Sequence, residues 1–201
     1  MKINKPIKLL LSTDSAIVHT GLAETTRLVF KKLLEKYPGK YEIEQLGWFN
    51  FGKNPNQETV PWKIHSTAVK DGKIDMSDKY GQRSFEQLRA NFKPDIVYTN
   101  GDIWCFDHLL ESPARNTFRL ASYYTIDGEP YYGRDLKRGK KSEWGAKLEK
   151  TDRLIVLTET GREVLKGSCA ELKDKEIDVI YHPSDIDRFK PIPLDELEEM
   201  R

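Results

Sequence analysis

The densest group of side chains that could bind a polar ligand lies at residues 127–133, where two carboxylates and two tyrosines surround Gly128 and Pro130. Carboxylates accept hydrogen bonds from sugar hydroxyls, and an aromatic face packs on the apolar face of a pyranose ring. We therefore expect a carbohydrate contact here, through Asp127 and Glu129. The alternative interpretation is a turn built by glycine and proline, with the tyrosines half buried.

A second candidate follows the apolar run at residues 7–11, where a polar loop carries Asp14 and closes on Thr20-Gly21 at the start of a predicted helix. The first turn of a helix offers free backbone N–H groups and a partial positive charge, and glycine lets a ligand approach the backbone closely. The loop is therefore expected to hold a phosphate or a sugar hydroxyl. Alternatively, Thr20 only caps the helix and Gly21 relieves a tight turn.

A third candidate follows the run at residues 95–99, where Asn100, Gly101 and Asp102 bring an amide, a glycine and a carboxylate together. The Asp102 carboxylate is suited to binding sugar hydroxyls. It is equally suited to capping a helix over residues 103–110, and the sequence leaves both interpretations open.

The elements that must position these residues are short apolar strands alternating with helical stretches. Strands are predicted at 7–11, 41–48, 61–69, 95–99, 118–126, 153–158 and 177–181, and helices at 22–37 and 77–92, with Asp71-Gly72 as a turn. Continuous apolar runs indicate strands covered on both faces, so we expect a single α/β domain with a Rossmann-like, doubly wound parallel sheet. Ligands of such sheets bind outside the carboxyl ends of the strands, which is where all three candidates fall.

Composition excludes several other classes. Lys and Arg number 33 against 32 Asp and Glu, so no global field favours nucleic acid. The two cysteines and four histidines show no metal-ligand spacing, and the chain lacks a GxGxxG fingerprint, so we expect no metal, no cofactor and no dinucleotide-dependent reductase. With no signal peptide or span, a cytoplasmic location is expected. The basic segment 134–141 is interpreted as a solvated loop, with contact to a phosphate or to an anionic surface, including peripheral membrane contact, as the alternative.

Four motifs in order resemble the N-terminal domain of GT-B glycosyltransferases, specifically the retaining family four. They are Asp14 with Thr20-Gly21-Leu22-Ala23, Lys93-Pro94-Asp95-Ile96-Val97-Tyr98, the segment 151–161, and the segment 180–191. The resemblance implies transfer of a sugar from a nucleotide-sugar donor to an unidentified acceptor, with retention. It also implies that the backbone near Gly21 meets the donor diphosphate.

The same resemblance divides the chain. Asp185, Phe189 and Pro191 fit the family signature at the crossing into the second domain, although Pro183-Ser184 replaces the usual glycine. Residues 1–190 are then the acceptor-side domain and 191–201 the start of an interdomain linker. The donor-binding domain is expected in the same polypeptide or in a separate chain, and 201 residues alone are expected to be inactive.

Asp127 takes the position of a family histidine that contacts the transferred sugar, so the resemblance implies a catalytic role for it. The expected substrate-binding residues are Asp14, Thr20, Gly21, Asp102, Tyr124 and Glu129. A rival function from another class stays open: a non-catalytic α/β module that binds a nucleotide or carbohydrate at the same strand ends.

Overall fold

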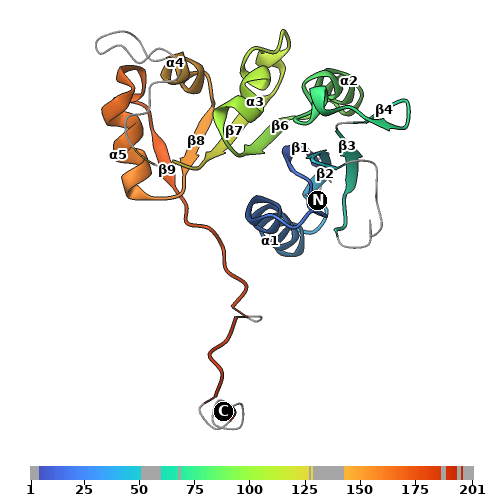
Figure 1. Ribbon diagram of the computed structural model, residues 1–201, viewed down its shortest axis with the longest axis horizontal. Coiled ribbons are helices and arrows are strands. Elements are labelled where there is room, and N and C mark those ends of the chain that lie inside the picture. Colours follow the sequence, from blue (N-terminus) through green and yellow to red (C-terminus); the bar gives the residue numbers. More distant parts are fainter. Residues whose placement is uncertain are drawn as a thin grey trace.

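A parallel β-sheet forms the centre of the molecule. The computed structural model describes residues 5–50, 60–67, 69–126, 128, 143–186, 189–193 and 196. Within them, seven parallel strands form one sheet in the order β3-β2-β1-β6-β7-β8-β9 (Figure 1). The strands are β1 (Ile7–Asp14), β2 (Tyr41–Trp48), β3 (Lys63–Ser66), β6 (Ile96–Asn100), β7 (Arg119–Tyr124), β8 (Arg153–Val156) and β9 (Ile177–Val179). The predicted Rossmann-like α/β class is confirmed.

Helices cover both faces of this sheet. They are α1 (Gly21–Lys36), α2 (Gln82–Phe92), α3 (Ile103–Leu110), α4 (Glu143–Glu149) and α5 (Glu159–Ser168), with 3-10 turns η2 (Met76–Asp78), η3 (Arg115–Thr117) and η4 (Ala170–Leu172). One hydrophobic core joins a face of the sheet to α2, α3, α4 and α5, and the other core joins the opposite face to α1. Figure 1 shows α1 on the other side of the strands from α2. No helix among the described residues is long and apolar enough to cross a membrane.

The position of β1 inside the sheet explains why its residues 9–11 are all apolar. Leu10 packs into the core beneath α2 to α5, whereas its neighbours Leu9 and Leu11 point to the opposite face and pack with Phe30 of α1. A strand in the middle of a doubly covered sheet buries both sets of side chains, so no polar residue alternates with the apolar ones. Leu10 and Leu11 are accordingly 0% exposed.

The chain changes direction across the sheet at β1. After β1 the strands proceed through β2 to β3 on one side, and the chain then crosses back to place β6 on the other side of β1. In the β1–β6 pairing, Thr13 lies opposite Asn100, so the two strands end together. This is the topological switch point, where the connections leaving two neighbouring strands diverge and open a crevice for a ligand.

Two predicted elements differ in detail. The helix expected over residues 77–92 is split into η2 and α2, because Gly81 adopts a left-handed conformation with φ +74°. The strand expected over 61–69 is limited to β3. Asp71-Gly72 does form the predicted turn, with positive φ at both residues, and joins the hairpin of β4 (Val69–Lys70) and β5 (Lys73–Ile74).

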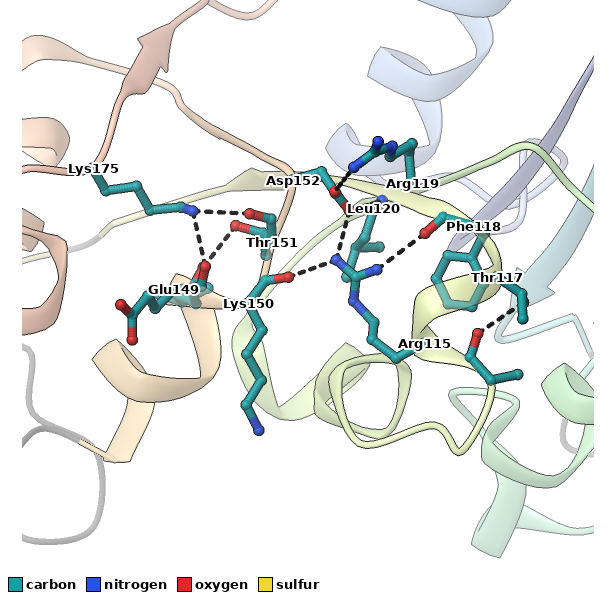
Figure 2. A network of polar contacts seen from close by, with 12 residues as sticks. Arg115, Thr117, Phe118, Arg119, Leu120, Glu149, Lys150, Thr151, Asp152 and Lys175 are labelled. Carbon is teal, nitrogen blue, oxygen red and sulfur yellow. Dashed lines mark hydrogen bonds and ion pairs between the residues drawn. The ribbon is translucent and has the colours of Figure 1, made fainter.

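An ionic network fixes the opposite, amino-terminal edge of the sheet (Figure 2). The Asp152 carboxylate accepts hydrogen bonds from the Leu120 amide at 2.8 Å and from the guanidinium groups of Arg115 and Arg119 at 2.6 and 2.8 Å. Arg115 also donates to the Lys150 carbonyl at 2.5 Å, and Lys175 secures the same turn from the other side. The starts of β7 and β8 are thereby held in register, which places their carboxyl ends at the candidate site.

Candidate functional site

The carboxyl ends of four neighbouring strands bring the candidate residues to one edge. Asp14 of β1 lies opposite Trp48 of β2, and Asn100 of β6 lies opposite Tyr123 of β7. Helices α1 and α3 both begin at this edge, with Thr20 and Asp102 at their N-cap positions. Residues separated by more than 80 positions in sequence therefore meet at the switch point.

Asp14 and Thr20 are directly connected. The Thr20 hydroxyl donates a 2.6 Å hydrogen bond to the Asp14 carboxylate and accepts one of 3.1 Å from the Ala23 amide. Asp14 is only 5% exposed. Burial raises the pKa of its carboxyl, and the bond from Thr20 offsets part of that rise. A carboxyl with a raised pKa in a ligand-binding crevice is a characteristic of functional sites.

The loop between β1 and α1 is rigidly held by Gln45. The Gln45 side chain donates to the Thr13 hydroxyl and to the Asp14 carbonyl, both at 2.9 Å, and accepts from the Ala16 amide at 3.2 Å. The Ser15 amide bonds the Trp48 carbonyl at 3.0 Å. These buried contacts fix the backbone of the loop from which the Asp14 side chain projects, and the Thr20 hydroxyl holds the carboxylate itself.

Gly21 is the first residue of α1, and its side-chain position is open. A Cβ placed on it would meet no heavy atom within 4 Å, and its φ does not lie in the left-handed region. The interpretation of Gly21 as a relief of backbone strain is therefore wrong, whereas the capping role of Thr20 is confirmed. The close approach of a ligand to the backbone at Gly21 stays a prediction, and the open space is compatible with it.

Asp102 precedes α3, but its side chain makes no capping hydrogen bond with the first turn. Tyr80, from the loop before α2, is close enough to Cys105 and Asp102 for both of them to change the pKa of its hydroxyl. Burial, the neighbouring Cys105 and the negative charges of Asp102 and Asp14 raise the pKa of Tyr80 to about 12. Both carboxylates thus affect the same phenol, and they follow the ends of the neighbouring strands β1 and β6.

Aromatic rings pack together at the same strand ends. The Tyr80 ring meets Trp48 and Phe49 edge to face, with centroids 5.5 and 5.6 Å apart. Gly101, at φ +149°, passes so close to Trp48 that a Cβ would lie 3.1 Å from the indole. Carboxylates beside aromatic rings are the combination that carbohydrate ligands select.

Buried polar groups without partners occur at the same strand ends. Neither polar atom of the Asn100 amide, nor the Ser15 hydroxyl, has a hydrogen-bond partner among the described residues, although both residues are 0% exposed. An unsatisfied buried polar group costs about 1–3 kcal/mol, so such groups at a crevice indicate a place where a ligand or water completes the bonding.

Tyr124 is positioned differently from the other candidates. Its side chain is 0% exposed, and its hydroxyl accepts a 3.3 Å hydrogen bond from the Ile103 amide at the start of α3. In this structure Tyr124 supports the start of α3 and is not exposed at the carboxyl edge of the sheet. Asp127 and Glu129 lie outside the described residues, as do the basic segment 134–141 and most of 191–201.

The arrangement excludes one kind of chemistry and favours another. Burial raises the pKa of the Cys105 thiol to about 11, so it is not a poised nucleophile. Within the described part of the chain, no cluster of three or more His, Cys, Asp or Glu side chains is able to hold a metal ion. What remains is a set of fixed acceptors and aromatic walls, which can orient hydroxyl groups of a neutral ligand.

Sequence reasoning missed three of these residues as site candidates. Tyr80 and Trp48 belong to segments with no sequence signal for ligand binding, because their place at the crevice depends on a long-range crossover. Ser15 looked like one of several polar loop residues. Asn100, although noted beside Asp102, differs from an ordinary strand-end amide only in being buried without a partner.

Comparison with protein-family models and with curated protein sequences gave no match. Among solved structures, the chain is similar to UGT89C1 of Arabidopsis thaliana complexed with UDP, with a TM-score of 0.51 and 12% sequence identity. The match covers 98% of this chain and 54% of the other, so this chain spans about half the length of its structural neighbour. At this identity the similarity shows the fold: a Rossmann-like domain that matches half of a GT-B architecture.

Proposed function

We propose that this chain is the acceptor-side half of a GT-B glycosyltransferase that moves a sugar from a nucleotide donor to an acceptor. The observation that carries the proposal is the topological switch point, where Asp14, Thr20 and Asp102 follow the neighbouring ends of β1 and β6. Supporting it, the chain matches 54% of a protein solved with bound UDP, which is the share expected of one of two such domains.

The acceptor side of the proposal rests on charge. The negative charges of Asp14 and Asp102 both act on Tyr80, and such charge disfavours an anionic ligand at that point and favours a hydroxyl group. A carboxylate that accepts a hydrogen bond from an acceptor hydroxyl orients its oxygen for attack on the donor sugar. Positioning of this kind supplies a large part of the rate enhancement when two substrates must meet.

The donor side of the proposal involves Gly21 and Asp127. The start of α1 at the exposed Gly21 would present backbone amides to the donor diphosphate and stabilise its charge as it departs. Asp127, which follows β7 in sequence, would contact the transferred sugar, in the role implied by the resemblance to family four. Retention of the anomeric configuration belongs to the same proposal, as does a nucleotide-binding domain in the same polypeptide or in a partner chain.

Sugar transfer tests the proposal. Transfer from labelled UDP-, GDP- and ADP-sugars to a glycan panel should be measured for this chain alone and for the longest polypeptide or complex in which it occurs in cells. We expect transfer by the larger species and none by the 201-residue chain. Asp14→Asn and Asp102→Asn should each lower turnover of the larger species at least tenfold.

The rival is a binding module without catalysis. It predicts saturable binding of a nucleotide sugar by the isolated chain, measured by calorimetry, together with no transfer by any form of the protein. That pair of results would overturn the glycosyltransferase proposal. If neither aspartate substitution changes the rate of sugar transfer, Asp14 and Asp102 do not take part in the reaction.

A further inference from the structure

A pair of tryptophans lies beyond the switch point, on the helices that follow β6 and β7. Trp104 is in the first turn of α3 and Trp144 in the first turn of α4, and the two helices contact one another. Their ring centroids are 5.8 Å apart, with the planes inclined by 50°. Trp104 is 51% exposed, so part of its ring is accessible to a ligand.

Both tryptophans face the same edge of the sheet as Asp14 and Asp102. Helix α3 begins directly after β6, so Trp104 stands two residues beyond Asp102. Helix α4 runs back to the start of β8, so its first turn is its end nearest the carboxyl edge (Figure 1). The first turns that carry the aromatic pair therefore lie at the same edge of the sheet as the ends of β1 and β6.

A hollow of about 210 Å³ lies between the two helices. Its lining residues are Ile103, Trp104, Asp107, Glu143, Trp144 and Lys147. Pockets for drug-sized molecules measure about 300–1,000 Å³, so this hollow suits a smaller unit such as one sugar ring. The indoles supply the apolar walls, and charged side chains supply the polar ones.

Lys147 holds the polar wall in place. Its ammonium group lies 3.2 Å from Asp107, 3.1 Å from Glu111 and 3.5 Å from Glu143. The lysine thus fixes the carboxylates of two helices. Each carboxylate that binds the lysine can still accept further hydrogen bonds from a ligand. With three carboxylates around one ammonium, the wall keeps a negative charge that repels a phosphate or a nucleotide and accepts hydrogen bonds from hydroxyls.

We propose that the hollow between α3 and α4 binds a neutral pyranose unit of the acceptor, stacked on Trp104 and Trp144 and hydrogen-bonded to Asp107 and Glu143. This rests on the proposed function in one respect only, that the bound saccharide is the acceptor. The carbohydrate chemistry follows from the hollow itself: two aromatic faces for the C–H surface of the ring, and oriented carboxylates for its hydroxyls.

The tryptophan side chains give a direct readout, because the chain has four of them and Trp62 belongs to the other core, which packs on α1. In ¹⁵N-labelled protein the indole N–H signals should be assigned with Trp104→Phe and Trp144→Phe. Maltose, cellobiose, lactose and N,N′-diacetylchitobiose should then be titrated into the full chain at millimolar concentration. We expect at least one disaccharide to shift the Trp104 and Trp144 signals saturably, while that of the buried Trp62 stays in place.

Variants make the test specific. Trp104→Ala should weaken the affinity for that disaccharide by roughly threefold to tenfold, because one stacking contact is lost. Trp104→Phe should weaken the affinity less. Tyr181→Ala removes an exposed aromatic ring far along the chain, 67% exposed, and should leave the affinity unchanged. The proposal is overturned if none of the four sugars gives a saturable shift, or if binding leaves both indoles unmoved.

The two proposals fail separately. Saccharide binding at the tryptophans without sugar transfer by any form of the protein would overturn the glycosyltransferase proposal and leave the proposed saccharide site intact. Transfer whose acceptor KM is unchanged by Trp104→Ala would overturn the saccharide site and leave the enzyme.

Discussion

The Thr20 hydroxyl lies between two partners: it donates to the Asp14 carboxylate at 2.6 Å and accepts from the Ala23 amide at 3.1 Å. One side chain therefore connects the end of β1 to the first turn of α1. The bond to Ala23 caps the helix and stabilises the fold, whereas the bond to Asp14 holds the buried carboxylate of the candidate site. Substitutions separate these two contributions.

Asp14→Asn should make the protein more stable at neutral pH. Because burial raises the folded-state pKa of Asp14 above its usual value near 3.8, its stability contribution is fully present below that pH and is lost as the pH rises through the folded pKa. Asparagine still accepts from Thr20 and carries no charge, so we expect a gain in the range common for stabilising substitutions, about 0.5–2 kcal/mol.

Urea unfolding of both proteins between pH 4 and 7 measures this effect. The stability difference in favour of Asp14→Asn should grow with pH. A variant that is less stable than the natural chain at pH 7 would contradict the assigned cost of the buried charge. Loss of sugar transfer in the stabilised variant would indicate that the carboxylate is kept for function.

Thr20→Ala should destabilise the fold by about 1–3 kcal/mol, because it removes a helix cap and leaves Asp14 without its donor. Thr20→Ser keeps the hydroxyl and should cost less than about 0.5 kcal/mol. In the Asp14→Asn background the cost of Thr20→Ala should change by at least about 0.5 kcal/mol, as expected for residues in direct contact. Strictly additive effects in the double variant would contradict the coupling.

Gly21→Val should leave folding nearly intact while it lowers sugar transfer. A Cβ at Gly21 meets open space, so the change in unfolding free energy should stay within about 0.5 kcal/mol. The branched side chain would hold a diphosphate away from the amides of the first turn. Gly101→Ala is the contrasting variant, since its φ of +149° and the 3.1 Å approach to Trp48 should cost more than about 1 kcal/mol.

At the amino-terminal edge of the sheet, the stability contribution of Asp152 should depend on pH in the opposite direction to that of Asp14. Partial burial alone would raise the pKa of Asp152, but the Leu120 amide, Arg119 and Arg115 hold it at about 2. Its contribution is therefore present above about pH 4 and is lost as the pH falls through about 2. Asp152→Asn should cost about 1.5–3 kcal/mol at neutral pH, as expected for hydrogen bonds to a charged group.

Unfolding by urea at pH 7 and at pH 3 checks this prediction, and the cost of Asp152→Asn should be smaller at the lower pH. Arg119→Ala is the matched control: its side chain is 80% exposed, so its ion pair should contribute less than about 1 kcal/mol. An equal loss from both variants would contradict the central place of Asp152 in the network of Figure 2.

Local sequence patterns determined the elements of this protein. The apolar run of β1 and the Thr20 cap before α1 are visible from neighbouring residues, because strand burial, helix capping and turn formation depend on contacts within a few positions. The Asp71-Gly72 turn is of the same kind. The break at Gly81 was missed, since the periodicity of the helix continues through it.

Only the tertiary structure decided which of these residues form a site. Asp14 and Asp102 share Tyr80 because β6 returns to the side of β1 opposite β2, and Trp104 meets Trp144 because α3 and α4 pack side by side. The same packing buries Tyr124 beneath α3. Such contacts join residues far apart in the chain, and they follow from the order of strands in the sheet, which no local pattern of side chains specifies.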